Sequence, residues 1–338
     1  MKKFVITLTA LLLTVATYAE QKRWAVVELS TIYMRLMPDY ESPLETQELM
    51  GTVVEIVGQK GYWREIVSPQ PYKAWCTDKG IVEMSEEEIK AYRNAPKCTF
   101  TELYGHIYER PSEKSVTICD LVGGDVMRIA GREKDPDNLL IRKSQRWTKV
   151  MLPSGKTGWV KTSQIKPHTG FKSIAKGEGN AESISDKLME KIIGSAMKLK
   201  GVPYLWGGMS PKGVDCSGLV RISHIMNGIL LPRNASQQIK CGDRVPMAVD
   251  ARFWDDRSDT DALRKEMLVR VQDLQRGDLV FFGTPATDEK PMRVTHVGIY
   301  LGENRIIHSS HRVRINSLIP GNPDYYENAH RLIGAIRL

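Results

Sequence analysis

The stretch that decides the fold is GVDCSGLV, residues 213–220, in which a lone cysteine follows an acidic residue and precedes Ser-Gly. The apolar-periodic run LVRISHIM continues from it, so Cys216 is predicted to lie on the first turn of a helix. Unpaired N–H groups and the helix dipole at that position favour a thiolate and are expected to lower the pKa of Cys216. The same N–H groups can donate to an oxyanion. The stretch therefore predicts a nucleophilic thiol.

Two histidines further along the chain supply the base that such a thiol needs. His296 opens the strand-like run THVGIYLG, and His308 lies in the next one, RIIHSS. A hairpin through residues 302–304 would bring the two rings side by side near one end of a sheet. His296 is expected to take the thiol proton, and His308 to orient it through the nitrogen that faces away from the sulfur. His311 is an alternative for that third position.

The region before residue 167 contains two similar sets of short alternating strands. Trp63 and Trp75 in the first set are twelve residues apart, as are Trp147 and Trp159 in the second. Short strands broken by Gly, Pro and Asp are typical of small all-β barrels. The second set ends in GKTGWV, and the pattern resembles that of bacterial SH3-like modules. We expect barrels at residues 20–84 and 98–167, the second with an insertion at 132–140.

The remaining segments predict an exported chain with an α+β C-terminal region. MKK followed by FVITLTALLLTVATYA reads as a secretory signal over residues 1–19, and no later run is apolar enough for stable membrane insertion. Residues 168–183 form a linker. Between 184 and 338, a capped helix near 185–201 precedes the strands LVFFG, VGIYLG and RIIHSS. The net charge of +8, without a dense basic run, argues against nucleic acid as a partner.

Six motifs in the C-terminal region carry a family resemblance. In order they are PYLWGG, VDCSGLV, LPRNASQQ, RGDLVFF, THVGIYLG and IIHSS. This set resembles the NlpC-type papain-like cell-wall cysteine peptidases. With SH3-like modules in front, it is similar to the subgroup that cleaves the γ-D-glutamyl bond to a diamino acid in free peptidoglycan stem peptides. The resemblance implies two SH3-like barrels followed by a papain-like α+β domain, with Cys216 as nucleophile, His296 as base and His308 as third member.

The resemblance also implies a set of substrate-binding residues. Tyr204 would lie beside the oxyanion and Trp206 would form a wall of the pocket. Asp215 and Ser217 would bind the free amine of an N-terminal L-alanine, because a buried carboxylate needs a cationic partner that a substrate ammonium can supply. The first SH3-like module would close the pocket with an acidic residue and a tyrosine, for which Glu45 and Tyr72 are the candidates.

Several alternatives stay open at this point. The enzyme could instead be an amidase cutting the muramoyl–L-alanine bond, or the chain could be a non-catalytic wall-binding protein. Residues 246–270 are either a helical excursion over the cleft or a surface insertion. Whether Cys98 pairs with Cys119 is undecided. Neither the choice between lysine and diaminopimelate nor that between intact wall and released peptides follows from the sequence. We expect a monomer with no cofactor and no metal.

Overall fold

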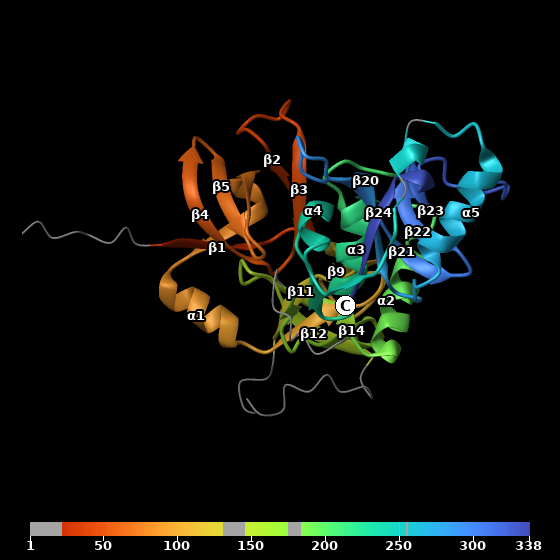
Figure 1. Ribbon diagram of the computed structural model, residues 1–338. Coiled ribbons are helices and arrows are strands. Elements are labelled where there is room, and N and C mark those ends of the chain that lie inside the picture. Colours follow the sequence, from red (N-terminus) through yellow and green to blue (C-terminus); the bar gives the residue numbers. More distant parts are fainter. Residues whose placement is uncertain (1–21, 131–145, 175–183, 250, 255) are drawn as a thin grey trace, which may run out of the picture.

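The computed structural model describes residues 22–130, 146–174, 184–249, 251–254 and 256–338 (Figure 1). The predicted signal at residues 1–19, the predicted insertion at 132–140 and most of the predicted linker lie outside these ranges. Within them, no helix has both the length and the apolar content that crossing a bilayer requires.

The first β-module is a seven-stranded antiparallel sheet. Its strands are β1 (Arg23–Val27), β2 (Thr31–Arg35), β3 (Leu44–Leu49), β4 (Val53–Lys60), β5 (Trp63–Ser68), β6 (Tyr72–Thr77) and β7 (Ile81–Met84). They lie in the order β3-β2-β6-β5-β4-β1-β7, so β3 is at one edge. Alternate side chains of these strands point inward and form one apolar core, as the period-2 pattern of the sequence requires.

The second β-module repeats this topology strand for strand. It consists of β8 (Lys97–Phe100), β9 (Tyr104–Tyr108), β10 (Thr117–Val122), β11 (Val126–Ile129), β12 (Trp147–Met151), β13 (Thr157–Lys161) and β14 (Ile165–Pro167). The order β10-β9-β13-β12-β11-β8-β14 is that of the first module with every number raised by seven. The predicted internal repeat is therefore confirmed. Cys98 and Cys119 belong to this module, and both are free thiols.

Helix α1 (Glu86–Asn94) joins the two β-modules. Ser85 caps it, since its side chain accepts from the Glu88 N–H while the Glu88 carboxylate accepts from the Ser85 N–H. Short 3₁₀ turns, η1 (Asp78–Gly80) and η3 (Thr162–Gln164), precede the last strand of each module.

The C-terminal domain is built on a six-stranded sheet in the order β19-β24-β20-β21-β22-β23. These strands are β19 (Asp243–Val245), β20 (Leu279–Thr284), β21 (Arg293–Gly302), β22 (Arg305–Ser310), β23 (Arg312–Ser317) and β24 (Leu332–Arg337). The shorter strands β15 (Lys172–Ser173), β16 (Met209–Ser210), β17 (Gly213–Val214) and β18 (Ile229–Leu230) pair outside it. The predicted antiparallel neighbours β20, β21 and β22 are confirmed.

One face of this sheet packs against the helices that follow the β-modules. These helices are α2 (Asp186–Lys198), α3 (Cys216–Ile225) and α4 (Ala235–Gln238). Val297, Ile299 and Ile307 point from the sheet into the same core as Leu219 and Ile222 of α3. Helix α3 therefore lies across the sheet with its N-terminus near the start of β21.

The residues 246–270 build the opposite face of the sheet. They contain η4 (Ala251–Trp254) and most of α5 (Thr260–Val271), which lies on the far side of the sheet from α3 (Figure 1). Leu263 and Met267 of α5 share a second apolar core with Phe282 of β20. A further 3₁₀ turn, η5 (Ala329–Arg331), closes that layer. Of the two alternatives left open for this segment, the excursion over the cleft is not what it forms, because its apolar side chains pack into a second core.

Edge strand β3 fastens the first β-module to the C-terminal domain. Three consecutive buried polar residues on it, Thr46, Gln47 and Glu48, each bind that domain. The Gln47 Oε1 accepts from the Met209 N–H at 2.7 Å, and Glu48 forms an ion pair with the buried Arg221 at 3.5 Å. An edge strand with these side chains is used here as a docking strand.

Candidate active site

Cys216 is the first residue of α3, as predicted, and only 8 % of its surface is exposed. Burial, and next the Asp215 carboxylate, raise the pKa of the Cys216 thiol to about 12. The N–H groups of Val297 and Ser217 oppose this shift but do not outweigh it. The expectation of a lowered thiol pKa is therefore wrong for the resting site. Loss of solvation destabilises the thiolate more than the N–H groups and the dipole at the helix start stabilise it. Val297 follows His296 directly, so the backbone beside the predicted base lies next to the thiol.

The two predicted histidines are hydrogen bonded to each other. The Nε2 of His296 and the Nδ1 of His308 are 2.8 Å apart, and their rings meet edge to face. His308 opposes Gly298 in the β21–β22 pairing, which puts it diagonally across from His296 on one face of the sheet. Burial lowers the pKa of His296, and the neighbouring His308 lowers it further. His308 is fully buried and its pKa is lowered by burial as well, whereas His311 is exposed at a turn.

Two aromatic side chains that the sequence analysis did not single out as site residues enclose the histidine pair. The Tyr326 ring centroid lies 4.6 Å from that of His308 and 5.6 Å from that of His296. Phe282 lies 5.7 Å from His296 and packs against Tyr326. Both aromatic residues belong to the core that α5 covers. The extra helical segment thus supports the face of the sheet from which the histidines project.

Asp215 caps α3, and its charge is already balanced within the protein. Its Oδ1 accepts from the Gly218 N–H at 2.7 Å, as an N-cap does. The buried Arg233 guanidinium donates hydrogen bonds to both carboxylate oxygens, at 3.1 Å and 2.5 Å. Arg233 therefore supplies within the protein a cationic partner for the carboxylate that the sequence analysis assigned to a substrate ammonium. Arg233 stands in the quoted LPRNASQQ motif, but only the fold brings it back to position 215.

Ser217 and Thr46 complete the coordination of this arginine. The Nη1 of Arg233 donates to the Ser217 hydroxyl at 2.9 Å, and Ser217 in turn donates to Asp215 at 3.1 Å. The Nε of Arg233 donates to the Thr46 hydroxyl of β3 at 2.7 Å. A single buried cation thereby joins the cap of the nucleophile helix to the first β-module.

Glu45 and Tyr72 of the first β-module lie together, as the resemblance implies. The Tyr72 hydroxyl donates to Glu45 Oε2 at 2.8 Å, and both side chains are half-buried. Burial, and then Glu45, raise the pKa of Tyr72 to about 12, while the nearby Arg233 opposes the shift. Among the ion pairs of the described residues, none includes Glu45, in contrast to Asp215. Glu45 is therefore the carboxylate of this group that can still accept a cation.

Tyr204 and Trp206 lie on the loop that leads into the nucleophile helix. Tyr204 is held through its backbone, because its N–H donates to the His311 carbonyl and it bridges to Val214. Burial raises the pKa of Tyr204, and the neighbouring Cys216 raises it further, so the hydroxyl keeps its proton. Trp206 is 66 % exposed. Gly207 follows with a φ of 73° and packs closely against Leu44 and Glu45, so a side chain there would collide with β3.

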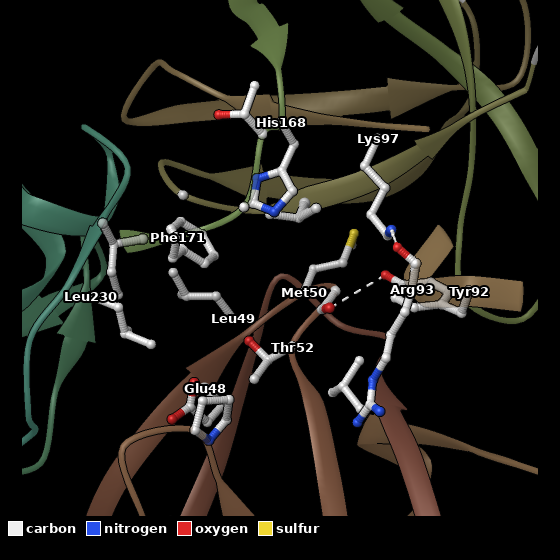
Figure 2. A pocket seen from close by; sticks show the side chains of 18 of the residues that line it. Glu48, Leu49, Met50, Thr52, Tyr92, Arg93, Lys97, His168, Phe171 and Leu230 are labelled. Atoms are coloured by element: carbon white, nitrogen blue, oxygen red, sulfur yellow. Dashed lines mark hydrogen bonds between the residues drawn. The ribbon is translucent and has the colours of Figure 1, made fainter. Parts of the chain in front are cut away.

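A separate cavity of about 580 Å³ lies where the two β-modules meet the C-terminal domain. Figure 2 shows Leu49 and Met50 on one side of it, with His168, Phe171 and Leu230 on others. The Tyr92 hydroxyl donates to the Gly51 carbonyl in its wall. None of the nine predicted site residues lines this cavity, so it is distinct from the thiol site.

A thiol at a helix start, a hydrogen-bonded histidine pair on the adjacent sheet and a capping carboxylate are the elements of a cysteine hydrolase of papain-like architecture. Residues 201–330 match the model of the NlpC/P60 family. The chain thus carries an NlpC/P60 domain, and the predicted arrangement of SH3-like modules followed by that domain is confirmed.

Two relatives named as dipeptidyl-peptidases resemble the chain over most of its length. It is 27 % identical over 313 residues to the gamma-D-glutamyl-L-lysine dipeptidyl-peptidase of Bacillus cereus, covering 90 % of this chain and 79 % of the relative. It is 24 % identical to dipeptidyl-peptidase 6 of Lysinibacillus sphaericus, with 88 % and 93 % covered. The crystal structure of an NlpC/P60 family protein from Bacillus cereus superposes with a TM-score of 0.65 at 22 % identity, covering 93 % and 99 %. The likeness to that structure supports the same fold across all three domains.

Proposed function

We propose that this chain is an exported cysteine peptidase that hydrolyses the γ-D-glutamyl bond to a diamino acid in peptidoglycan stem peptides bearing a free N-terminal L-alanine. The wall peptide is the substrate class that the NlpC/P60 domain and the named relatives favour. The observation that carries the proposal is the unpaired Glu45 of the first β-module, hydrogen bonded to Tyr72 in the region of Arg233. An ammonium group bound there would be two residues away from the bond that is cut.

The reaction uses groups with the protonation states described above. The neutral Cys216 thiol gives its proton to His296 while its sulfur forms a bond to the γ-carbonyl carbon of D-glutamate. The carbonyl oxygen becomes an oxyanion, to which Tyr204 and the helix-start N–H groups donate. The C–N bond then breaks, and the leaving amine takes the proton from His296. Water, activated by His296, hydrolyses the thioester and restores the thiol.

Substrate recognition divides between two carboxylates. Asp215 is saturated by Arg233 and by N–H donors, so it shapes the pocket with Ser217 instead of serving as the main ammonium partner. Glu45 and Tyr72 supply the counter-charge and an adjacent hydroxyl. Trp206, exposed on the loop after Tyr204, forms the outer wall. The protein is proposed to act as a monomer and to need no metal.

The test is digestion of L-Ala-γ-D-Glu-L-Lys and of its diaminopimelate counterpart, followed by mass spectrometry. We expect release of the L-Ala-D-Glu dipeptide by the wild type and none by Cys216→Ala. Acetylating the alanine amine should reduce kcat/KM at least about 10- to 100-fold, since a charged hydrogen bond contributes about 1.5–3 kcal/mol. Glu45→Gln should lose a similar factor on the free peptide, whereas the control Glu41→Gln, exposed on the loop before β3, should not.

The alternatives give different results in the same assay. Equal cleavage of free and acetylated peptides contradicts an amine-anchored site. If the enzyme is instead a muramoyl–L-alanine amidase, it will release the stem peptide from muramoyl peptides and leave the tripeptide intact. A non-catalytic wall-binding protein will cleave neither substrate yet sediment with purified wall.

A further inference from the structure

A line of three polar side chains crosses adjacent strands behind the thiol. His296 on β21, His308 on β22 and Asn316 on β23 project from one face of the sheet, each diagonal to the next. The His296 Nε2 lies 2.8 Å from the His308 Nδ1, and the His308 Nε2 lies 2.9 Å from the Asn316 Oδ1. Asn316 is 7 % exposed, so this line is nearly closed to solvent at its far end.

The orientation of the Asn316 amide is determined by its other neighbour. Its Nδ2 donates to the Asp324 carbonyl at 2.7 Å, and that carbonyl also accepts from the Ser317 backbone N–H at 3.0 Å. A carbonyl can only accept, so the amide nitrogen must face Asp324 and the amide oxygen must face His308. The loop is held in place by the ion pair of Asp324 with Arg305.

The positions of the ring protons follow from this orientation. The Asn316 oxygen can only accept, so the His308 Nε2 carries hydrogen. A neutral His308 then has a bare Nδ1, which must accept from a hydrogen on the His296 Nε2. A neutral His296 is left with a bare Nδ1, and that is the nitrogen free to take the Cys216 proton.

We propose that Asn316 is a positioning residue that sets the tautomers of both histidines, a role that rests on the proposed function. With the opposite amide orientation, His308 would hold its proton on Nδ1 and force His296 to accept through Nε2. His296 would then carry its hydrogen on Nδ1 and could not act as the base. During attack, the S–H bond breaks, the S–C bond forms and the proton moves to His296 Nδ1. The His296 Nε2–H stays directed at His308 throughout.

We call the hydrogen-bonded line of Asn316, His308 and His296 the relay. It is the main element that orders the protons on the two rings. Among the described residues, Arg314 on β23 acts on the pKa of both rings, and Tyr326 on the following loop packs against both and is influenced by Cys216 of α3. Burial lowers the pKa of His308, the hydrogen bond to Asn316 raises it, and Arg314 lowers it again. The net result is a pKa of about 4. Both rings are thus neutral at physiological pH, the state in which tautomer choice matters.

The first test replaces the amide with a side chain of similar size that cannot hydrogen bond. Asn316→Leu should lower kcat by about 10- to 100-fold, since a misdirected base forfeits much of a general-base contribution of about 10²–10⁴. KM should stay within about twofold, because Asn316 lies behind the histidines. Asn322→Ala is the matched control, since Asn322 binds Ser317 in the same loop but does not reach His308. Full kcat in the Asn316→Leu variant overturns the proposal.

The second test separates proton ordering from support of the loop. Asn316→Asp keeps an acceptor toward His308, so kcat should remain within about tenfold of wild type. Its carboxylate stabilises a protonated histidine, which should move the acid limb of the kcat profile to higher pH. An unchanged profile, with losses equal in the Leu and Asp variants, identifies a merely structural residue and overturns the proposal.

The third test needs no substrate. Nitrogen NMR of histidine-labelled protein at pH 7 should show both His296 and His308 protonated on Nε2, with mixed tautomers in Asn316→Leu. The two residues are assigned from His296→Gln and His308→Gln. A His308 protonated on Nδ1 in the wild type contradicts the relay. Because this measurement is independent of peptide cleavage, failure of the proposed function and failure of the relay can be told apart.

Discussion

At the scale of single residues, burial decides the charge state of the proposed catalytic groups. Burial favours an uncharged thiol at Cys216 and an uncharged ring at His296. Two neutral partners can still exchange a proton when the sulfur attacks, since the charge then passes to the oxyanion. The site is therefore expected to react with a bound carbonyl more readily than with a free alkylating agent.

The buried Arg233–Asp215 pair is the residue-scale contact with the largest expected effect on stability. Arg233→Met would leave the Asp215 carboxylate buried without a cation. Breaking such a pair from one side costs about 3–5 kcal/mol. Urea unfolding should show a loss of that order in the free energy of unfolding.

An exposed ion pair provides the control for that measurement. Glu190 and Arg276 form a pair in which both side chains are about half exposed, so Glu190→Gln should cost about 0–1 kcal/mol. Equal losses in the two variants would mean that Arg233 is not balancing a buried charge.

The residues proposed to carry the chemistry could be singled out from the sequence because each stands in a local pattern. Cys216 precedes a helical periodicity, and His296 and His308 lie on consecutive strands joined by a short turn. Arg233 and Asn316 were not predictable as partners. Their importance depends on which side chains the fold brings beside them, and neither position carries a periodicity or spacing that indicates this.

At the scale of elements, strand β3 and helix α5 have structural roles, in docking and in packing, that their sequences only partly indicate. Strand β3 is an edge strand whose buried Thr46, Gln47 and Glu48 all bind the C-terminal domain. Helix α5 covers the sheet face that holds Phe282 and Tyr326. Both elements flank the site, one from the substrate side and one from behind the histidines.

Adjacent residues on α5 give a direct test of its packing role. Met267 is fully buried in the second core, so Met267→Ala should cost about 2–5 kcal/mol in the free energy of unfolding. Leu268 is 43 % exposed on the same helix, and Leu268→Ala should stay within about 0.5 kcal/mol. Urea unfolding of both variants measures the difference. Equal, small effects would show that α5 is a loosely attached surface helix.

Elements with strong local signals were predicted well, and those defined by tertiary contacts were not. The repeat of the β-modules could be predicted because the strands and turns of each copy are neighbours in sequence. In α2, Ser185 occupies the N-cap position without a side-chain hydrogen bond to the helix, the buried face is centred on Met189, Ile192, Ile193 and Ala196, and Met197 is exposed. The direction in which α5 would pack was left open, because an alternating charge pattern does not say which face of a sheet is free.

At the scale of the whole molecule, the three domains share polar contacts that none could satisfy alone. Lys212 of the C-terminal domain binds both Ser30 of the first β-module and Asp120 of the second. Arg221 is buried against Glu48 of the first β-module. The described parts of the three domains are thus joined into one unit, and unfolding is expected to report on all three domains together.

Buried histidines in two domains determine how that stability responds to acid. Burial lowers the pKa of His168, His224 and His308 to about 4 and of His296 to about 3, against about 6.5 in an unfolded chain. Between these values the unfolded chain binds more protons, so acid favours unfolding. Asp125 acts in the opposite sense, because burial raises its pKa and the folded state holds its proton more tightly.

The stabilising effect of the neutral histidines is complete above pH 6.5 and is lost as the pH falls toward about 4. Each histidine contributes a slope of up to about 1.4 kcal/mol per pH unit in that window. Urea midpoints measured at pH 7, 6 and 5 should therefore fall steadily, before most carboxylates titrate. His224→Gln removes one buried histidine away from the active site and should flatten the slope without abolishing it. A stability that stays level from pH 7 to 5 would mean that these rings take up protons while folded.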